Sequence, residues 1–398
     1  MSVPKIAVSL SGGVDSAVAC YLLKKKGFHI VGVYQRCWDT LNEAEDSVIC
    51  SHDVDYEDAK RIAEHLNVEL VYTDFSKQYW HQVFMYMINS FACGITPNPD
   101  IVCNQKIKFG VFYKYALTQL KCDYVATGHF ARNSYGPYLE NKPCGANRNG
   151  NICNARLLVP RDRIKDQTLF LSRIPQTALQ RTMFPIGEYL KSEVRDVARL
   201  QRLHVSDKRG TRGVCFIGKR NFAHFLDQYI EPKPGRFVHY ETGEVVGEHT
   251  GFHHYTIGQR TRLGGRRYAY FVIKKDLTSN DIFVATGRDH PALYSVTLEC
   301  VQPYWIAGIE PVELAKDGQM QCDFKFLNVS PMTRAIVKRS TVRQNSLVVE
   351  LSCPLRAITP GQFATFYAKD ECLGSAEIVA TGPSLFELGY DTADSAVK

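Results

Sequence analysis

The first third of the chain alternates between two patterns of hydrophobic positions. Short, nearly continuous apolar runs are typical of buried strands; they stand at Lys5–Leu10, Ile30–Tyr34, Val68–Tyr72 and Asp123–Thr127. Between them, Ser16–Lys26 predicts a helix that Gly27 ends, and Asp55–Leu66 repeats its apolar residues at helical spacing. Strands that alternate with helices predict an α/β fold, a doubly wound parallel sheet with helices on both faces.

The pattern changes twice along the rest of the chain. Gly, Pro and Asn are frequent in Ser134–Asn154, which predicts a surface excursion, and helical periodicity resumes over Gln176–Leu203. After Pro234, short β-type runs separated by turns predict a β-rich region that contains a small barrel. We therefore expect three domains: an α/β domain at 1–203, a small central domain at 204–285 and a C-terminal β-barrel domain at 286–398.

Composition narrows the class of protein. The chain has 398 residues, of which 45% are hydrophobic and 22% are charged, as in ordinary globular proteins. No apolar run approaches the ~20 residues of a membrane span, so no membrane partner is expected. None of the 13 cysteines stands in a C-x-x-C pair, so no metal-ligand set is indicated. The first predicted strand begins at Lys5, and no Arg- and Ser-rich transit segment is visible before it.

The net charge of +7 is unevenly distributed along the chain. Residues 37–59 contain eight acids and no Lys or Arg, whereas Arg199–Arg220 contains seven cations and one acid, and Arg260–Lys275 six cations and no acid. Clustered cations suit a nucleic-acid backbone, because each neutralised phosphate releases counterions. Charge alone leaves open the alternative of two solvated faces.

One candidate phosphate-binding loop lies between the first predicted strand and the first helix. A turn of small residues there lets backbone N–H groups face a phosphate, and the helix N-terminus adds positive potential. Ser11 and Ser16 can donate hydroxyl hydrogen bonds, and Asp15 can hold Mg²⁺ or cap the helix. A plain strand-to-helix turn is the alternative. The candidate residues are Ser9, Leu10, Ser11, Gly12, Gly13, Val14, Asp15 and Ser16.

This octapeptide resembles the pyrophosphate-binding loop of the ATP pyrophosphatase superfamily. The resemblance implies that ATP is cleaved between its α and β phosphates, and that a carbonyl oxygen of the substrate is activated as an adenylate. A competing Walker A pattern, Gly213–Arg220, ends in Arg where a Mg²⁺-binding hydroxyl is required, and its interior is bulky and apolar. It is therefore rejected as a phosphate loop.

Two further motifs each place a cysteine among cations. Thr96–Asn104 contains two prolines, which predict a stiff turn around Asn98 and Asp100, and Cys103 follows close to two lysines. Cys215 stands among three glycines, with Arg and Lys residues on both sides. Neighbouring cations favour a reactive thiolate. The alternatives are a buried structural cysteine in the first motif and a glycine-rich linker in the second.

Together, the three motifs resemble those of the tRNA 2-thiouridylase family, whose cysteine signatures are N-P-D-x-x-C-N and G-x-C-F-I-G. Further segments that resemble the family are Thr127–Arg132, Lys165–Leu171, Thr256–Arg260, Asp289–Tyr294 and Pro360–Phe363, so that the resemblance covers nearly the whole chain. Gly218–Phe222 and Asp370–Ser375 resemble the animal mitochondrial branch most, which implies a mitochondrial location.

The resemblance implies ATP-dependent thiolation of the wobble uridine of tRNA, with ATP and Mg²⁺ as cofactors. Ser9–Ser16 would bind the ATP phosphates, and Gln35 and Gly128 the adenosine. Cys103 would be the nucleophile and Cys215 the persulfide carrier, supplied by a relay that begins with a cysteine desulfurase. Sulfur transfer between the two thiols would leave a disulfide. Contacts with the target base or the tRNA are implied for Asn98, Pro99, Asp100, His129, Lys165, Asp166, Gln167 and Gln362, and Asp100 would assist proton transfer.

The chain departs from the family in one place. Where the family usually has an Arg-rich strand that touches tRNA, Cys322–Val329 has Lys325 as its only cation, so no contact is carried over. Three other interpretations stay in view. An amide-forming ATP pyrophosphatase would leave the two cysteines without a role. An RNA-binding protein with a non-catalytic loop would not need the intact octapeptide. An iron–sulfur cluster could use Asp100, Cys103 and Cys215 as ligands.

Overall fold

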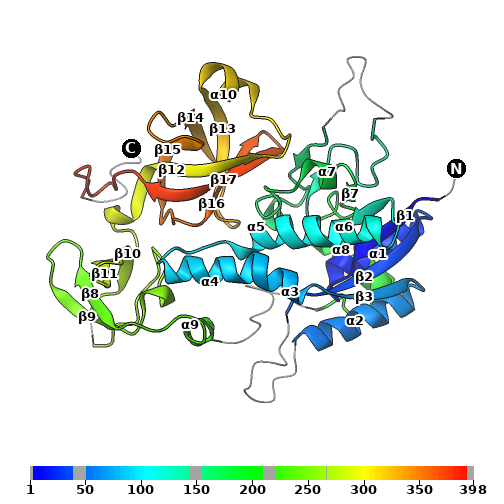
Figure 1. The fold of residues 1–398 in the computed structure, drawn as a ribbon, viewed down its shortest axis with the longest axis horizontal. Helices are drawn as coiled ribbons and strands as arrows, with labels where there is room; N and C mark the ends of the chain where they lie inside the picture. The colour runs from blue at the N-terminus through cyan, green and yellow to red at the C-terminus, as the bar shows by residue number, and fades with distance from the viewer. Residues whose placement is uncertain (1–2, 39–50, 144–153, 209–220, 266, 392–398) are drawn as a thin grey trace.

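The computed structural model describes residues 3–38, 51–143, 154–208, 221–265 and 267–391. Within these residues, the strands form one parallel sheet, one small mixed sheet and one closed antiparallel sheet (Figure 1). No helix in the described ranges combines the length and the apolar character that crossing a bilayer requires.

The parallel sheet has the strand order β3-β2-β1-β4-β7 in the described part of the chain. Its strands are β1 (Lys5–Ser9), β2 (His29–Arg36), β3 (Glu69–Asp74), β4 (Tyr124–Ala126) and β7 (Thr182–Met183). Ile6 and Val8 pack into one helical layer and Ala7 into the opposite one, as alternation along a strand requires. The predicted doubly wound α/β architecture is therefore confirmed.

Helices cover both faces of this sheet. They are α1 (Val14–Lys25), α2 (Ser51–His65), α3 (Ser76–Tyr79), α4 (Met85–Ala92), α5 (Pro99–Cys103), α6 (Tyr113–Thr118), α7 (Gln176–Leu179) and α8 (Lys191–Leu200), together with the π-helical segments η1 (Trp80–Phe84) and η2 (Asn104–Phe112) and the 3₁₀ turn η3 (Arg163–Lys165). The prediction of continuous helical structure over Gln176–Leu203 is wrong in its middle, because the edge strand β7 separates α7 from α8.

The surface excursion predicted for Ser134–Asn154 is also wrong in its first residues. Tyr135 and Leu139 are buried in the core between the sheet and α1, and Ala155 closes the same cluster from the other end. The Gly- and Pro-rich composition predicted a loop correctly, but two apolar side chains anchor that loop. Residues 144–153 lie outside the described ranges.

The central sheet has the order β10-β11-β8-β9 among the described residues. Its elements are β8 (Gly235–His239), β9 (Val245–His249), η4 (Phe252–His254), β10 (Tyr270–Asp276) and β11 (Asp281–Thr286), preceded by α9 (Phe222–Asp227). Phe225 and Leu226 of α9 do not pack on this sheet but in the α/β core, near Trp38 and Phe84. Helix α9 therefore joins two parts of the molecule (Figure 1).

The C-terminal strands close into a barrel, because β12 pairs with both β15 and β17. The elements are η5 (Pro291–Leu293), β12 (Tyr294–Trp305), α10 (Val312–Asp317), β13 (Gln319–Lys325), β14 (Thr333–Arg339), β15 (Ser346–Arg356), β16 (Phe363–Ala368) and β17 (Glu371–Thr381). β17 also pairs with β6 (Leu157–Leu158), which pairs with β5 (Arg132–Asn133). The predicted barrel is confirmed, and two strands from the α/β part extend its sheet.

Candidate active site

The predicted phosphate loop lies at the carboxyl end of the central strand β1. Gln35, near the end of β2, donates a hydrogen bond from Nε2 to Ser9 Oγ at 2.9 Å. Ser16 Oγ accepts from the Ser11 N–H at 3.2 Å and donates to the Gly13 carbonyl at 3.0 Å. Ligands of open α/β sheets bind at this edge, where connections leave a central strand in opposite directions. The structure thus brings Gln35 and the loop into one place.

Glycines allow the backbone to close around this loop. Gly12 has φ +70°, and a Cβ there would lie 2.1 Å from the Asp55 carbonyl oxygen at the start of α2. Gly128 follows β4, and a Cβ there would lie 2.5 Å from the Ser16 backbone nitrogen. Leu10 and Val14 point into the hydrophobic core, so these two loop residues can offer a ligand only their backbone.

Asp15 takes part in an ion pair instead of a helix cap. The N-cap of α1 is Gly13, with no side-chain cap, so the capping role considered for Asp15 is wrong. Asp15 Oδ1 lies 2.5 Å from Lys191 Nζ, and the same ammonium lies 5.7 Å from the centre of the Phe130 ring. Lys191, which the sequence did not single out, thereby connects the loop with the residues after β4.

A second lysine fastens the acidic helix α2 to the loop. Lys208 Nζ lies 2.7 Å from Asp55 Oδ1 and 2.5 Å from Asp58 Oδ2, and it donates to the Gly12 carbonyl at 3.0 Å. Arg199 is likewise paired with acids, Asp196 and Asp207. In the described part of the basic run Arg199–Arg220, these two cations are neutralised by protein carboxylates, which weakens the case for them as a tRNA surface.

The proline-rich motif forms the start of a helix, so the predicted turn is wrong in kind. Asn98 is the N-cap of α5, and its Oδ1 accepts from the Ile101 N–H at 3.4 Å. Pro99 occupies the first turn, where a missing backbone donor costs nothing. Asp100 and Cys103 follow at a spacing of three residues, which places them on one face. Cys103 is buried, with 7% of its surface exposed.

A π-helical stretch, η2, begins directly after Cys103. Its first residue, Asn104, donates from Nδ2 to the Phe170 carbonyl at 3.1 Å. The Asn104 Oδ1 atom is buried and has no hydrogen-bond partner among the described residues. π-Helical stretches inside helices are frequent at functional sites, and a buried open acceptor in a native protein calls for a functional explanation. Asn104 is a candidate that sequence reasoning missed, although it closes the cysteine motif.

The C-terminal barrel holds the peptide that precedes α5. Gln362 Nε2 donates to the carbonyls of Thr96 at 2.9 Å and Pro97 at 3.2 Å. Gln362 Oε1 accepts from Asn98 Nδ2 at 3.3 Å. Gly361 has φ +91°, and a Cβ there would lie 2.8 Å from the Thr96 carbonyl oxygen, so glycine is required for this approach. Two predicted site residues, Asn98 and Gln362, are therefore in direct contact across two domains.

Lys108 lies between Asp100 and His129. Burial raises the pKa of the Asp100 carboxyl, and the Lys108 ammonium acts against that rise. Burial and the same ammonium lower the pKa of His129 well below its usual value, so the imidazole is neutral at pH 7. His129 Nε2 lies 3.5 Å from Lys108 Nζ, and Nδ1 lies 2.8 Å from Thr127 Oγ1. We assign the tautomer in which Nδ1 donates to Thr127 and Nε2 accepts from Lys108.

Lys165 and Gln167 lie at the rim of this region. Lys165 is exposed at the end of η3, where a phosphate can reach it. Gln167 Oε1 accepts from the Phe130 N–H at 2.8 Å, and the Gln167 N–H donates to the Phe130 carbonyl at 3.0 Å. Gln167 therefore fixes the backbone next to His129, besides any contact that it makes with RNA.

Asp166 differs from its two neighbours because it points into the protein. It is 2% exposed; its Oδ1 accepts from the Thr168 N–H at 2.9 Å, and its Oδ2 lies 3.5 Å from Lys325 Nζ. A carboxylate at this depth presents almost no surface to tRNA, so the geometry does not favour the direct tRNA contact that the resemblance implies for Asp166. Lys325, the lone cation where the family has an Arg-rich strand, is buried in the same pair.

Comparisons with known proteins agree with these site features. Three family models match in succession: "tRNA methyl transferase HUP domain" at residues 4–219, "tRNA methyl transferase PRC-barrel domain" at 223–286 and "Aminomethyltransferase beta-barrel domain" at 295–378. "Mitochondrial tRNA-specific 2-thiouridylase 1" of Drosophila melanogaster is 45% identical over 381 residues, which are 95% of this chain and 94% of the relative. The Homo sapiens protein of the same name is 43% identical, and the match covers 96% of this chain and 92% of the relative. "tRNA-specific 2-thiouridylase MnmA 1" of Geobacillus kaustophilus is 41% identical, and the match covers 95% of this chain and 96% of the relative.

The chain belongs to the tRNA 2-thiouridylase family. The match to the HUP domain model, which contains the Ser9–Ser16 loop, indicates that this thiouridylase uses ATP. The resemblance stated from the three motifs is thereby confirmed. Cys215 lies outside the described residues. The two predictions that depend on it, the Cys103–Cys215 disulfide and the iron–sulfur cluster alternative, lie outside them as well.

Proposed function

We propose that this thiouridylase replaces the C2 oxygen of the wobble uridine of tRNA by sulfur in an ATP-dependent reaction. The observation that carries the proposal is a continuous set of contacts from the nucleotide loop to the helical segment around Cys103, made of α5 and η2. Asp15 pairs with Lys191, Lys191 lies over Phe130, and Phe130 follows His129, which contacts Lys108 on the helix after Cys103. Nucleotide activation and sulfur transfer require two such centres next to one another.

For the nucleotide, Ser9–Ser16 would bind the phosphates through the backbone and the Ser11 and Ser16 hydroxyls. Gln35 and Gly128 would border the adenosine. The residues present fit a Mg²⁺ ion, since Lys191 engages only Oδ1 of Asp15, and protein sites often bind Mg²⁺ through one or two carboxylates and the substrate phosphates. Mg²⁺ would neutralise phosphate charge there. Adenylation of the uridine oxygen would release pyrophosphate.

For the tRNA, Asn98, Pro99 and Asp100 would contact the target base at the start of α5. His129, Lys165, Gln167 and Gln362 would contact the surrounding RNA, and Asp166 would support this loop through its hydrogen bonds from Thr168. Asp100 is suited to proton transfer, because burial raises the pKa of its carboxyl toward the working pH. The three-part division at 1–203, 204–285 and 286–398 remains part of this proposal.

For sulfur, Cys215 would carry the outer atom of a persulfide from a donor chain that begins with a cysteine desulfurase. The Cys103 thiolate would attack Cys215 Sγ, form the Cys103–Cys215 disulfide and release the outer sulfur to the adenylated carbon, from which AMP leaves. Two electrons from an external dithiol would then restore both thiols. The relatives named mitochondrial support a mitochondrial location, and the bacterial relative shows that the fold itself does not require one.

The nucleotide chemistry is tested with ATP labelled at the α phosphate. With tRNA present, label should appear in AMP, and Gly128→Ala should slow this by about tenfold or more, because overpacking costs about 1–3 kcal/mol and 1.4 kcal/mol is tenfold. Gly264→Ala is the matched control, since no heavy atom lies within 4 Å of a Cβ there. Formation of ADP as the tRNA-dependent product, or equal rates for the two alanine variants, would contradict the proposed site.

The two cysteines should fail at different steps. Given labelled persulfide from a desulfurase, Cys215→Ser should not acquire sulfur, whereas Cys103→Ser should become labelled but form no 2-thiouridine. Wild-type protein with one equivalent of persulfide and no reductant should accumulate a cross-linked peptide that contains both residues. Cys93→Ser, at an exposed cysteine, is the control and should behave as wild type. Normal turnover by Cys103→Ser would show that Cys103 is a structural residue.

The role of Asp100 predicts a pH dependence. Proton transfer requires the carboxylate form of Asp100. The acid limb of the pH profile, where the thiolation rate falls as the carboxylate is protonated, should therefore lie above the ordinary aspartate pKa of 3.8. Lys108→Gln removes a cation that lowers the pKa of Asp100, and it should move that limb to higher pH. Lys106→Gln, at an exposed neighbour, should leave it in place. Measured at saturating tRNA, identical limbs in wild type and Lys108→Gln would exclude Asp100 as the titrating group.

A further inference from the structure

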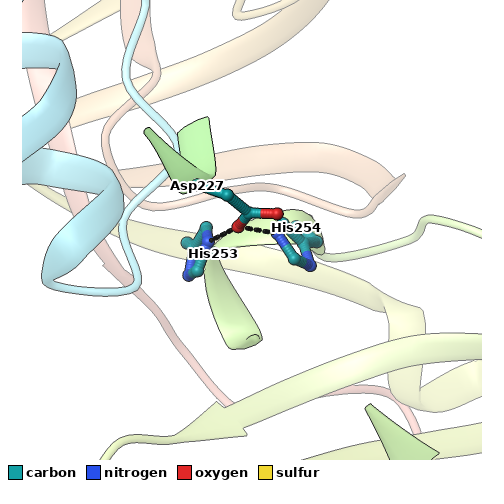
Figure 2. Close-up of side chains that lie close together, drawn as sticks. All are labelled: Asp227, His253 and His254. Carbon is teal, nitrogen blue, oxygen red and sulfur yellow. Dashed lines mark hydrogen bonds and ion pairs between the residues drawn. The ribbon is translucent and has the colours of Figure 1, made fainter. Parts of the chain in front are cut away.

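Two histidines and an aspartate meet where the chain enters the central domain. Figure 2 shows Asp227, the last residue of α9, between the rings of His253 and His254 of η4. Asp227 Oδ1 lies 2.9 Å from His253 Nε2 and 2.6 Å from His254 Nε2. None of these side chains belongs to the nucleotide or cysteine centres, and the sequence indicated no metal-ligand set that includes them.

The carboxylate oxygen and the two imidazole nitrogens lie close enough together to bind one metal ion. All lie within 4.8 Å of one another. Ligands about 2.0–2.1 Å from a tetrahedral zinc ion lie roughly 3.3–3.4 Å apart. To admit the ion, the two aspartate–histidine separations would therefore open by less than about 1 Å, and the two imidazole nitrogens, at most 4.8 Å apart, would approach one another by no more than about 1.5 Å.

We propose that Asp227, His253 and His254 form a binding site for a divalent transition-metal ion of the zinc type, which fastens the central domain to α9. Two imidazole nitrogens and one carboxylate oxygen suit such an ion, whereas Mg²⁺ and Ca²⁺ prefer sites made of oxygens. His253 is 2% exposed, and His254 is partly exposed. The partly open side leaves room for a water molecule as the fourth ligand.

The protonation states favour metal binding. Burial lowers the pKa of His253, so its imidazole is neutral at pH 7. Burial raises the pKa of Asp227, but the hydrogen bonds from the two imidazoles outweigh it and lower that pKa overall. The ion would take the place of the proton between each Nε2 and Oδ1, and each ring that binds the ion through Nε2 would carry its single N–H proton on Nδ1. The Lys275 ammonium opposes a cation here, since burial lowers the pKa of Lys275 only to about 8 and leaves it mostly charged at pH 7.

The surroundings already orient both rings. His254 Nδ1 lies 3.4 Å from Thr250 Oγ1, which can accept the Nδ1 proton, as partners behind metal-bound histidines commonly do. A Cβ at Gly251 would lie 2.6 Å from His253 Cε1, so the glycine leaves the space that this ring occupies. These contacts limit the rotation that either ring needs before it can bind an ion.

The position of the site gives the ion a structural effect. Phe225 and Leu226, directly before Asp227, are anchored in the α/β core, whereas Phe252, directly before His253, packs in the core of the central sheet. A bond from one ion to both sides would fix the central domain relative to α9. In sequence, α9 follows the segment that contains Cys215, so the ion would also anchor the C-terminal flank of that segment.

The test uses the full-length, untagged, metal-stripped protein and Zn²⁺ in competition with a chromophoric chelator. Asp227→Asn keeps the size of the side chain but removes its charge. The affinity for one Zn²⁺ ion should fall by about 100-fold or more, since the loss of even an outer partner of a metal ligand costs about 10- to 100-fold. Glu241→Gln is the matched control, because Glu241 lies 2.7 Å from His290 but contacts a single imidazole. Zn²⁺ should raise the unfolding midpoint of wild type and Glu241→Gln more than that of Asp227→Asn.

X-ray absorption of the zinc-loaded protein separates this site from cysteine sites. Wild type should show imidazole and oxygen ligation that disappears in Asp227→Asn and persists in Glu241→Gln. Ligation by sulfur alone in all three proteins, or equal Zn²⁺ affinity in Asp227→Asn and Glu241→Gln, would overturn the proposal. Because the readout is metal binding, a failure of the thiolation mechanism would leave this result unaffected.

Discussion

The arrangement of the active site depends on the hydrogen bonds with which Gln362 holds the peptide before α5. The Gln362 side chain donates to the carbonyls of Thr96 and Pro97 and accepts from the Asn98 amide, and thereby holds the start of α5, the helix that carries Asp100 and Cys103. Each such bond contributes only about 0.5–1.5 kcal/mol net. Their effect lies in position, because they tie the start of α5 to the C-terminal barrel.

A buried ion pair also joins the C-terminal barrel to the α/β domain. Lys325 of β13 and Asp166 are 5% and 2% exposed, and Ser172 donates to Ser375 of β17 at 3.0 Å nearby. Desolvation makes such a pair a weak source of stability, but each charge is unfavourable without the other. The pair therefore favours one register between barrel and α/β domain. Lys325 is thereby engaged within the protein, at the interface between the two domains.

The sequence predicted those parts of the site whose residues are neighbours along the chain. The Ser9–Ser16 loop and the two cysteine motifs are local signals, and the parallel sheet followed from periodicity. What it could not show are contacts between distant positions: Asn98 with Gln362, 264 residues apart, Asp166 with Lys325, 159 residues apart, and Asp227 with the histidine pair. The strand β7 was missed because two residues, Thr182 and Met183, are too few to show a period. Whether a charged residue faces RNA or protein, as for Asp166, depends on burial that no motif encodes.

The central claim is that the barrel positions the start of α5 for catalysis, and a double-mutant cycle tests it most directly. Thiolation of tRNA is measured as kcat/KM for Asn98→Ala, Gln362→Ala and the double variant. The account predicts a coupling of about 0.5–1.5 kcal/mol, or roughly 2- to 13-fold less loss in the double variant than the product of the single losses. Gln321→Ala, at an exposed position of β13, should combine additively with Asn98→Ala. Additive losses for Asn98 and Gln362 as well would contradict the account.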